Sequence, residues 1–418
     1  MQFKKLAVCG ALVLAAAMMT QMISAGGAGK SVAQIGAGKV TVFDVTKYGA
    51  AADDAADDTA GFQKALDAAK AGKGTVLVPR GTYMFNGTLT VPEGVTLQGT
   101  TVHPTGASCT LVVKAGRGSD NGAPFLTLKA GSTLQGVAIR YTIQNATNPY
   151  KYPFAVRLSG ANITIQDLYA YNAYQLIDAG SVASPNHHIE RVYGWTYKTG
   201  VYIDKCNGSG LLRDVHLWPF DGSNGKAATL TNATGFLLGY AKDEKLEGCF
   251  VIAYKLGYHF KDFGSGAGNY TMEMSGADCG PLGMQVEKVG SLKVNQGQFM
   301  QAIEINASNT GAVSLSGCGF WSYDNTQHQV KAQGAGAVTI DSCHFNSWDD
   351  KKKGYYCIIG DGAGKLTVTN CDFMAGKNQI SLSANVKAAD IRGNLLHGGK
   401  KIQNSSKGSV TIDQNPEC

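Results

Sequence analysis

A short pattern of alternating apolar and polar residues returns along most of this 418-residue chain. One copy is Val338-Thr339-Ile340, and such alternation predicts a β-strand with one buried face. A residue that marks the end of each copy follows a few positions later, and successive marks are 20 to 34 residues apart. A repeat of this length indicates a solenoid that grows by whole coils. The pattern therefore predicts an all-β parallel β-helix, with one copy in every coil.

A second series of strands lies between the marks of the first. Its copies are Gln175-Leu176-Ile177-Asp178, Val201-Tyr202-Ile203-Asp204, Phe236-Leu237-Leu238-Gly239, Tyr258-His259-Phe260-Lys261, Met284-Gln285-Val286-Glu287, Ile303-Glu304-Ile305-Asn306 and His328-Gln329-Val330-Lys331. Because side chains alternate between the faces of a strand, the third residue of each copy should point into the core. The outward positions then form two columns across the coils. The first column is Leu176, Tyr202, Leu237, His259, Gln285, Glu304 and Gln329, and the second is Asp178, Asp204, Gly239, Lys261, Glu287, Asn306 and Lys331.

The composition agrees with a folded β protein. The chain has 54 glycines, 44% hydrophobic residues and only 16% charged residues, which excludes disorder, a coiled coil and collagen. The formal net charge of +6 is too small to indicate a nucleic-acid partner.

The first residues have the pattern of an export signal. Lys4 and Lys5 form a basic start, and residues 6–19 are an apolar run too short to span a bilayer. Small residues follow, so we expect residues 1–25 to be a signal peptide. No other stretch is long and apolar enough to cross a membrane. The protein is therefore expected to be secreted, to an extracellular or periplasmic location.

The rest of the chain is predicted to form one domain. Residues 26–39 are rich in glycine and alanine and favour a flexible lead-in. Residues 40–418 carry the strand pattern, and about residues 40–94 form an N-terminal cap. Within the cap, residues 61–70 have apolar positions at helical spacing, which predicts one short helix.

Several motifs of the cap carry a family resemblance. They are Phe43-Asp44-Val45, Tyr48-Gly49-Ala50, Asp57-Asp58-Thr59, Phe62-Gln63-Lys64-Ala65-Leu66, Gly74-Thr75-Val76-Leu77-Val78-Pro79, Gly81-Thr82-Tyr83 and Val95-Thr96-Leu97-Gln98-Gly99. With them the chain resembles the opening of the rhamnogalacturonase/epimerase-like pectate lyase domains, also called glycosyl hydrolase family 28-related. The resemblance implies a single-stranded, right-handed, pectin lyase-like β-helix with a short N-terminal capping helix. It also implies a carbohydrate bound in a groove along one face.

The resemblance does not extend to a known catalytic centre. The aspartates and the His-Gly motif of the polygalacturonase branch are absent from the equivalent positions, which are Ala173, Thr199, Leu256, Leu282 and Gln301. Since this fold serves many functions, the outward columns must supply the candidates.

Two glutamates of these columns are the candidate catalytic pair. Glu287 and Glu304 lie on adjacent coils in different columns, a diagonal of about 8 Å. An inverting glycosidase separates its carboxyl groups by about 6.5–9.5 Å. Lys261, in the column of Glu287, is expected to keep Glu287 ionised as the base, which leaves Glu304 as the acid. His259 is close enough to tune a carboxyl group or to hold an acidic sugar. Solvated polar residues on an open sheet face are the alternative for each.

The remaining polar positions are candidate substrate contacts. Tyr202 and Gln285 share the first column with His259. Asp178 and Asp204 are expected in one column on adjacent coils, where two like charges need a cation or a proton. A calcium ion near this pair is one interpretation, and a lysine counter-ion is the other. No cofactor is otherwise required by the sequence.

Aromatic residues concentrate in the segments that lead into the second series of strands. They are Trp195, Tyr197, Trp218, Phe220, Trp321, Tyr323 and Trp348. Rings beside a polar groove suit a sugar, so we expect Trp195 and Trp218 to bind substrate at the rim, with packing between turns as the alternative. The insertion at 218–232 would overhang the groove as a loop that clamps the substrate.

The cysteines and a histidine pair favour structural roles. Four cysteines, Cys249, Cys318, Cys343 and Cys371, share one position of the repeat and are expected to stack inside the solenoid as small buried residues. Their spacing does not indicate a zinc site. In His187-His188, one side chain should face the core and the other should face outward.

Three functions stay open at this point. The first is a polysaccharide hydrolase that uses Glu287 and Glu304. The second is a lyase in which Lys261, His259 or Tyr202 removes a proton next to a uronate carboxyl group. The third is a surface β-helix that binds glycan without cutting it. All three have a polysaccharide as the partner.

Overall fold

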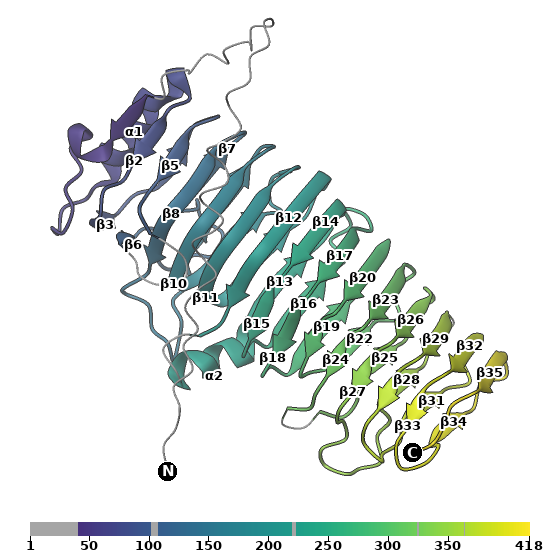
Figure 1. The fold of residues 1–418 in the computed structure, drawn as a ribbon. Helices are drawn as coiled ribbons and strands as arrows, with labels where there is room; N and C mark the ends of the chain where they lie inside the picture. The colour runs from purple at the N-terminus through teal and green to yellow at the C-terminus, as the bar shows by residue number, and fades with distance from the viewer. Residues whose placement is uncertain (1–40, 102–107, 220–222, 324–325, 363) are drawn as a thin grey trace, which may run out of the picture. The chain divides into compact units, whose positions relative to one another are not determined.

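The computed structural model describes residues 41–101, 108–219, 223–323, 326–362 and 364–418. The predicted signal peptide and lead-in lie outside the described residues. The described part is a parallel β-helix, as the repeat predicts, and each full coil contributes strands to three parallel sheets (Figure 1). Among the described residues, no helix is long and apolar enough to cross a membrane.

Sheet 1 contains the first series of strands. Its strands are β1 (Val42–Asp44), β2 (Thr75–Leu77), β5 (Thr96–Gln98), β14 (Ala241–Glu247), β17 (Asn269–Glu273), β20 (Ser291–Asn295), β23 (Ala312–Ser316), β26 (Val338–Asp341), β29 (Lys365–Thr369), β32 (Ala388–Arg392) and β35 (Ser409–Asp413). Four long strands bend from sheet 1 into the next sheet. They are β8 (Thr133–Arg140), β10 (Thr164–Ala179), β11 (His188–Ile203) and β12 (Cys206–Leu217).

Sheet 2 comes directly after sheet 1 in each coil, at the residues that mark the end of each copy of the first series. Its own strands are β3 (Gly81–Phe85), β6 (Cys109–Val113), β15 (Phe250–Ile252), β18 (Gly276–Asp278), β21 (Gln298–Phe299), β24 (Gly319–Phe320), β27 (His344–Phe345), β30 (Asp372–Phe373) and β33 (Leu395–Leu396). The sequence predicted at least two strands in a coil, and this sheet is the third.

Sheet 3 is the second series of the sequence. Its strands are β4 (Leu89–Val91), β7 (Leu126–Lys129), β9 (Phe154–Ser159), β13 (Thr234–Leu238), β16 (Leu256–Phe260), β19 (Leu282–Val286), β22 (Ile303–Ile305), β25 (Val330–Ala332), β28 (Ile358–Gly360), β31 (Ile380–Leu382) and β34 (Ile402–Asn404). The ends of β10 and β11 also pair in this sheet. The predicted core residues, from Ile177 to Val330, are fully buried.

The helices are short and lie at the edges of this solenoid. Helix α1 (Thr59–Ala69) covers the N-terminal end with Phe62 and Leu66 buried, and the 3-10 turns η1 (Val45–Tyr48) and η2 (Lys70–Gly72) flank it. The sequence predicted this helix at 61–70. A second helix, α2 (Ser223–Asn232), forms where the sequence predicted only a loop.

The cysteine stack is present as predicted. The residues that follow Cys318, Cys343 and Cys371 pair in register along sheet 2, so the three thiols lie at equivalent points of successive coils. All three are buried, and each of the nine described cysteines is a free thiol. The stack continues into Asn394, whose Oδ1 accepts a hydrogen bond of 3.0 Å from the Cys371 amide.

We expect Asn394→Ala to destabilise the C-terminal coils. The Asn394 Nδ2 also donates to the Val368 carbonyl at 2.9 Å, so alanine leaves two buried backbone groups without a partner. Each such group costs about 1–3 kcal/mol. Urea unfolding of Asn394→Ala should show that loss, whereas Asn385→Ala, at an exposed asparagine, should unfold like the unchanged protein. Equal loss in both variants would contradict this role.

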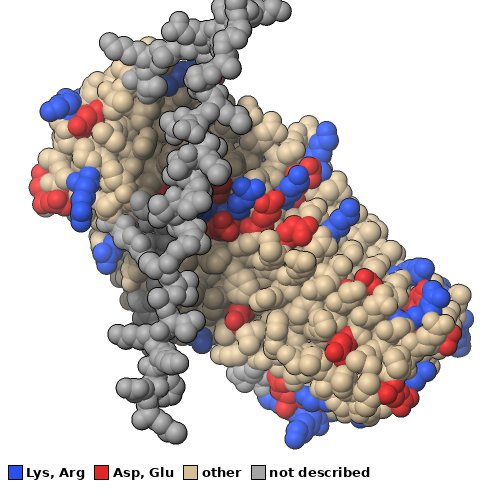
Figure 2. Space-filling model, in the orientation of Figure 1, with Lys and Arg blue, Asp and Glu red and all other residues tan. Residues whose placement is uncertain are grey.

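Charged side chains on the surface are paired across coils. The Arg191 Nε lies 2.7 Å from Asp167 Oδ1, and Arg213 Nη2 lies 2.8 Å from Glu247 Oε2. On the visible part of the face in Figure 2, basic and acidic side chains are interspersed in a row. Such alternation limits repulsion between stacked coils.

Candidate active site

The outward column of sheet 3 differs from the predicted column at both ends. Strand pairing places its members in the order Asp178, Tyr202, Leu237, His259, Gln285, Glu304 and Lys331. The middle of the prediction is confirmed, but Leu176 and Gln329 are wrong because both are buried corner residues. At both ends of the column, the residue that takes the place lies two positions further along the chain than predicted. A shift of two residues preserves the alternation of apolar and polar positions, so the sequence pattern cannot reveal it.

An open pocket of about 500 Å³ lies beside Glu304. Its walls come from the end of α2, from the turn before β19 and from the turn before β25. The lining residues are Leu230, Cys279, Gly280, Pro281, Leu282, Gln301, Ala302, Glu304, Tyr323, Thr326, Gln327 and His328. The predicted position of the insertion is thus confirmed, since Leu230 of α2 lines this pocket, although the segment is a helix and its role as a clamp stays a prediction.

Glu304 is held ionised in this pocket. Its Oε1 lies 3.4 Å from His328 Nε2. The close approach of His328 lowers the pKa of Glu304, burial opposes that shift, and Lys331 in the next coil adds to it. This shift disfavours a protonated Glu304, so the role of Glu304 as the acid stays a prediction that the structure does not favour. An ionised carboxylate is suited to accept a proton.

Glu287 points away from this pocket. Its Oε1 lies 2.8 Å from His259 Nε2, on the preceding coil, and it is absent from the pocket lining. Glu304 leans toward the following coil, so the two carboxylates turn in opposite directions. The Nζ of Lys261, which was expected to hold Glu287, lies 5.4 Å from the centre of the Phe263 ring.

His259 has the properties of a neutral imidazole. Burial lowers its pKa, and the Glu287 carboxylate opposes that shift without overcoming it. A neutral His259 can donate its Nε2 proton to Glu287 while carrying no charge. It therefore supports Glu287 through a hydrogen bond more than through an ion pair.

Asp178 and Asp204 are not members of one column. Asp178 pairs in register with Tyr202 on the next coil. Its Oδ2 forms an ion pair with Arg157 Nε at a distance of 2.6 Å. Asp204 is buried and accepts hydrogen bonds from the Tyr240 amide at 2.8 Å and the Ser265 hydroxyl at 2.9 Å. The counter-ion of Asp178 is thus an arginine that the sequence analysis did not consider. Calcium at either carboxylate stays a prediction.

Tyr202 lies beside these carboxylates on the sheet face. Burial, followed by the charges of Asp204 and Asp178, raises the pKa of Tyr202 to about 12. Its ring lies 5.4 Å from that of Phe263 and stacks on Phe154 at 6.3 Å. A phenol with so high a pKa stays protonated near neutral pH, so Tyr202 is a poor base for a lyase.

The two candidate tryptophans have different environments. Trp195 is fully buried, and it packs with Tyr197 and with Ala228 of α2. Its predicted place at the rim is therefore wrong. Trp218 is 37% exposed, and its ring packs edge-on against Tyr193 of sheet 2 at 5.4 Å. Trp218 is thus accessible, but it does not line the Glu304 pocket.

The sequence did not mark His328 and Gln301, two residues of the turns, as members of the site. His328 and Gln301 both stand just before a strand of sheet 3, and Tyr323 begins the same turn as His328. The Lys226 Nζ of α2 lies 5.9 Å from the centre of the Tyr323 ring and so joins the helix to this turn. The aromatic count had pointed to Tyr323 as a rim residue, and the pocket confirms that position.

Comparisons with known proteins agree with this architecture. The family model described as Rhamnogalacturonase A/epimerase, pectate lyase-like, matches residues 42–115. The structure is similar to the catalytic unit of a GH87 alpha-1,3-glucanase from Streptomyces thermodiastaticus, with a TM-score of 0.57, 16% identity, and coverage of 94% of this chain and 71% of that chain. No curated protein matches the sequence.

Two further solved structures share the fold. The N-terminal fragment of gene product 12 of bacteriophage Phi29 has a TM-score of 0.58 and 12% identity, and the match covers 88% of this chain and 72% of that one. PfbA, a surface adhesin of Streptococcus pneumoniae, has a TM-score of 0.50 and 13% identity, with 90% of both chains covered. These likenesses show the parallel β-helix fold, and the family match covers its N-terminal part.

Proposed function

We propose that this protein is a secreted enzyme that degrades a polysaccharide in the pocket beside Glu304. The observation that carries the proposal is the half-buried, ionised carboxylate in an open pocket, with the Tyr323 ring and the exposed Gln327 amide on its walls. A ring offers an apolar surface to a sugar, and amides bond its hydroxyl groups. The glucanase of similar fold acts on a glycan, which supports the same class of substrate here.

We favour hydrolysis as the chemistry. The roles of Glu287 and Glu304 are the reverse of those that the sequence predicted. Glu304 acts as the base that takes a proton from the attacking water, because His328, 3.4 Å away, lowers the pKa of its carboxyl group. Glu287, on the diagonal at about 8 Å between backbones, is the acid: it takes up a proton from solvent and then protonates the leaving oxygen. This requires the Glu287 side chain to leave His259 when the glycan binds.

A lyase is the second candidate, and Lys331 is the observation that favours it. Lys331 pairs in register with Glu304, so its ammonium group is placed to neutralise a uronate carboxylate. Glu304 would then remove the proton next to that carboxyl group, and the leaving oxygen would depart with formation of a carbon–carbon double bond. Glu287 has no part in this reaction.

Product chemistry separates these functions in one screen. The protein is incubated with neutral, uronic and sulfated polysaccharides, and reducing ends and ultraviolet absorbance are measured. New reducing ends without absorbance indicate hydrolysis, and reducing ends with the absorbance of an unsaturated uronate indicate the lyase. Binding without either product would overturn the enzyme proposal in favour of a glycan-binding protein.

The pH profile of His328→Ala should reveal the base. Activity is lost as the pH falls through the pKa of Glu304, which His328 holds below its ordinary value of 4.5. Without His328 beside the carboxylate the pKa of Glu304 rises, so we expect the acid limb of kcat to move to higher pH. His328→Gln, which keeps a donor, should move it less. An unshifted limb in His328→Ala would remove Glu304 from the role of base.

A further inference from the structure

One column of inward-facing positions in sheet 1 carries two polar side chains, a histidine and a glutamate, with a glycine in the coil between them. The register aligns Ile163, His187, Gly210, Glu244 and Tyr270 at the same position. His187 and Glu244 are two coils apart, and Gly210 between them has no side chain. A Cβ atom on Gly210 would lie 2.1 Å from Glu244 Oε2. Glycine therefore lets the two side chains meet through the middle coil.

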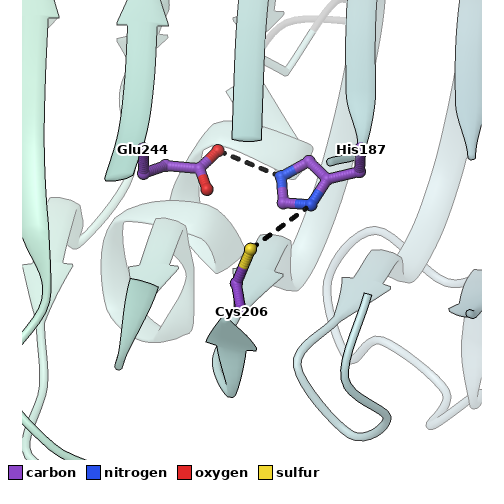
Figure 3. Close-up of side chains that lie close together, drawn as sticks. All are labelled: His187, Cys206 and Glu244. Carbon is purple, nitrogen blue, oxygen red and sulfur yellow. Dashed lines mark hydrogen bonds and ion pairs between the residues drawn. The ribbon is translucent and has the colours of Figure 1, made fainter. Parts of the chain in front are cut away.

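These side chains converge with the thiol of Cys206 (Figure 3). His187 Nε2 lies 3.0 Å from Glu244 Oε1, and Cys206 Sγ lies 4.0 Å from His187 Nδ1. One nitrogen of the histidine, the sulfur and a carboxylate oxygen all lie within 4.8 Å of one another. All three residues are buried. Among the described residues, this group alone brings together three such metal-ligating side chains.

One buried oxygen atom of this cluster has no hydrogen-bond partner. Glu244 Oε2 is buried and has no hydrogen-bond partner. An unpartnered carboxylate oxygen in a closed core is costly, and a cation is the usual remedy. Glu244 thus presents an oxygen that a metal ion would satisfy.

We propose that His187, Cys206 and Glu244 form a zinc site that joins three coils. Imidazole, thiolate and carboxylate are the zinc ligands of proteins. His187 Nδ1 lies 2.7 Å from the Ser184 carbonyl, which is the second contact that ligating histidines make, and it leaves Nε2 for the metal.

Charge and proton balance are consistent with Zn²⁺. One thiolate and one carboxylate neutralise the ion, so the closed site carries no net charge. Bonds form from the metal to Nε2, Sγ and a carboxylate oxygen, and the protons of Nε2 and Sγ leave to solvent. Ligand atoms of a tetrahedral zinc site are about 3.4–3.7 Å apart, so the side chains need to move by about 1 Å.

Refolding provides the test, because a closed site must be filled as the coils form. The test uses the full chain with Cys9, Cys279 and Cys418 changed to serine, so that these thiols cannot bind metal outside the core. This protein is unfolded and then refolded in three samples, which contain a chelator, Zn²⁺ or Co²⁺. After dialysis we expect one zinc per chain by elemental analysis, a higher unfolding temperature than for the chelator sample, and a thiolate-to-cobalt absorption band.

Two matched variants complete the experiment. Cys206→Ala should lose the bound zinc, the thermal shift and the cobalt band. Cys357→Ala, which also removes a fully buried thiol, should keep all three. Zinc retained by Cys206→Ala would overturn the proposal. So would a parent protein without the cobalt band, and that result does not depend on whether any variant folds.

Discussion

Glu304→Gln should reduce turnover by roughly three orders of magnitude or more, with glycan affinity nearly unchanged. Glutamine keeps the shape of the side chain and can still accept a hydrogen bond from His328, but it cannot take a proton. The loss should therefore appear in kcat and not in KM. Turnover with the substrate found in the product screen, and a binding isotherm with the same glycan, measure the two quantities separately.

Comparison with Glu287→Gln then identifies the reaction. A hydrolase with two carboxylates should lose activity in both variants, whereas a lyase should lose it only in Glu304→Gln. Glu93→Gln, at an exposed glutamate of the cap, is the control for a change of charge alone. Full activity of Glu304→Gln would refute the site.

Trp195→Ala should lower the free energy of unfolding by about 3–5 kcal/mol, the usual cost of emptying a buried tryptophan site. The Trp195 ring is fully buried, with its centre 5.2 Å from that of Tyr197 and 5.4 Å from that of Tyr171. Since the ring also supports Ala228 of α2, the helix should be loosened from the coil. Urea unfolding gives the first quantity, and limited proteolysis within α2 gives the second.

The same variant should also affect the pocket. Leu230 of α2 lines the same pocket as Glu304, so we expect a higher KM in Trp195→Ala than in Trp218→Ala. Trp218 is partly exposed and should cost much less stability on truncation. If both tryptophans cost the same, packing of α2 on Trp195 is not what stabilises this region.

Sequence alone determined the solenoid, because apolar alternation within a strand and its return in each coil are local properties. It predicted the buried face of the third sheet, the stack of Cys318, Cys343 and Cys371, and the opposite directions of His187 and His188, of which His187 is buried and His188 is not. It also placed Glu304 beside Gln285, since both lie in well-spaced copies of the repeat.

Tertiary structure decided what depends on the turns. The lengths of the turns set the register at Asp178 and Lys331, and a slip of two residues preserves alternation, so the pattern could not detect it. The direction of the Glu304 carboxylate depends on His328, which a turn brings back from the next coil.

The burial of Trp195 depends on α2, a helix within an insertion. His187 and Glu244, 57 residues and two coils apart, meet because Gly210 in the coil between them has no side chain. Such contacts join residues far apart in the chain, and only the stacked coils bring them together.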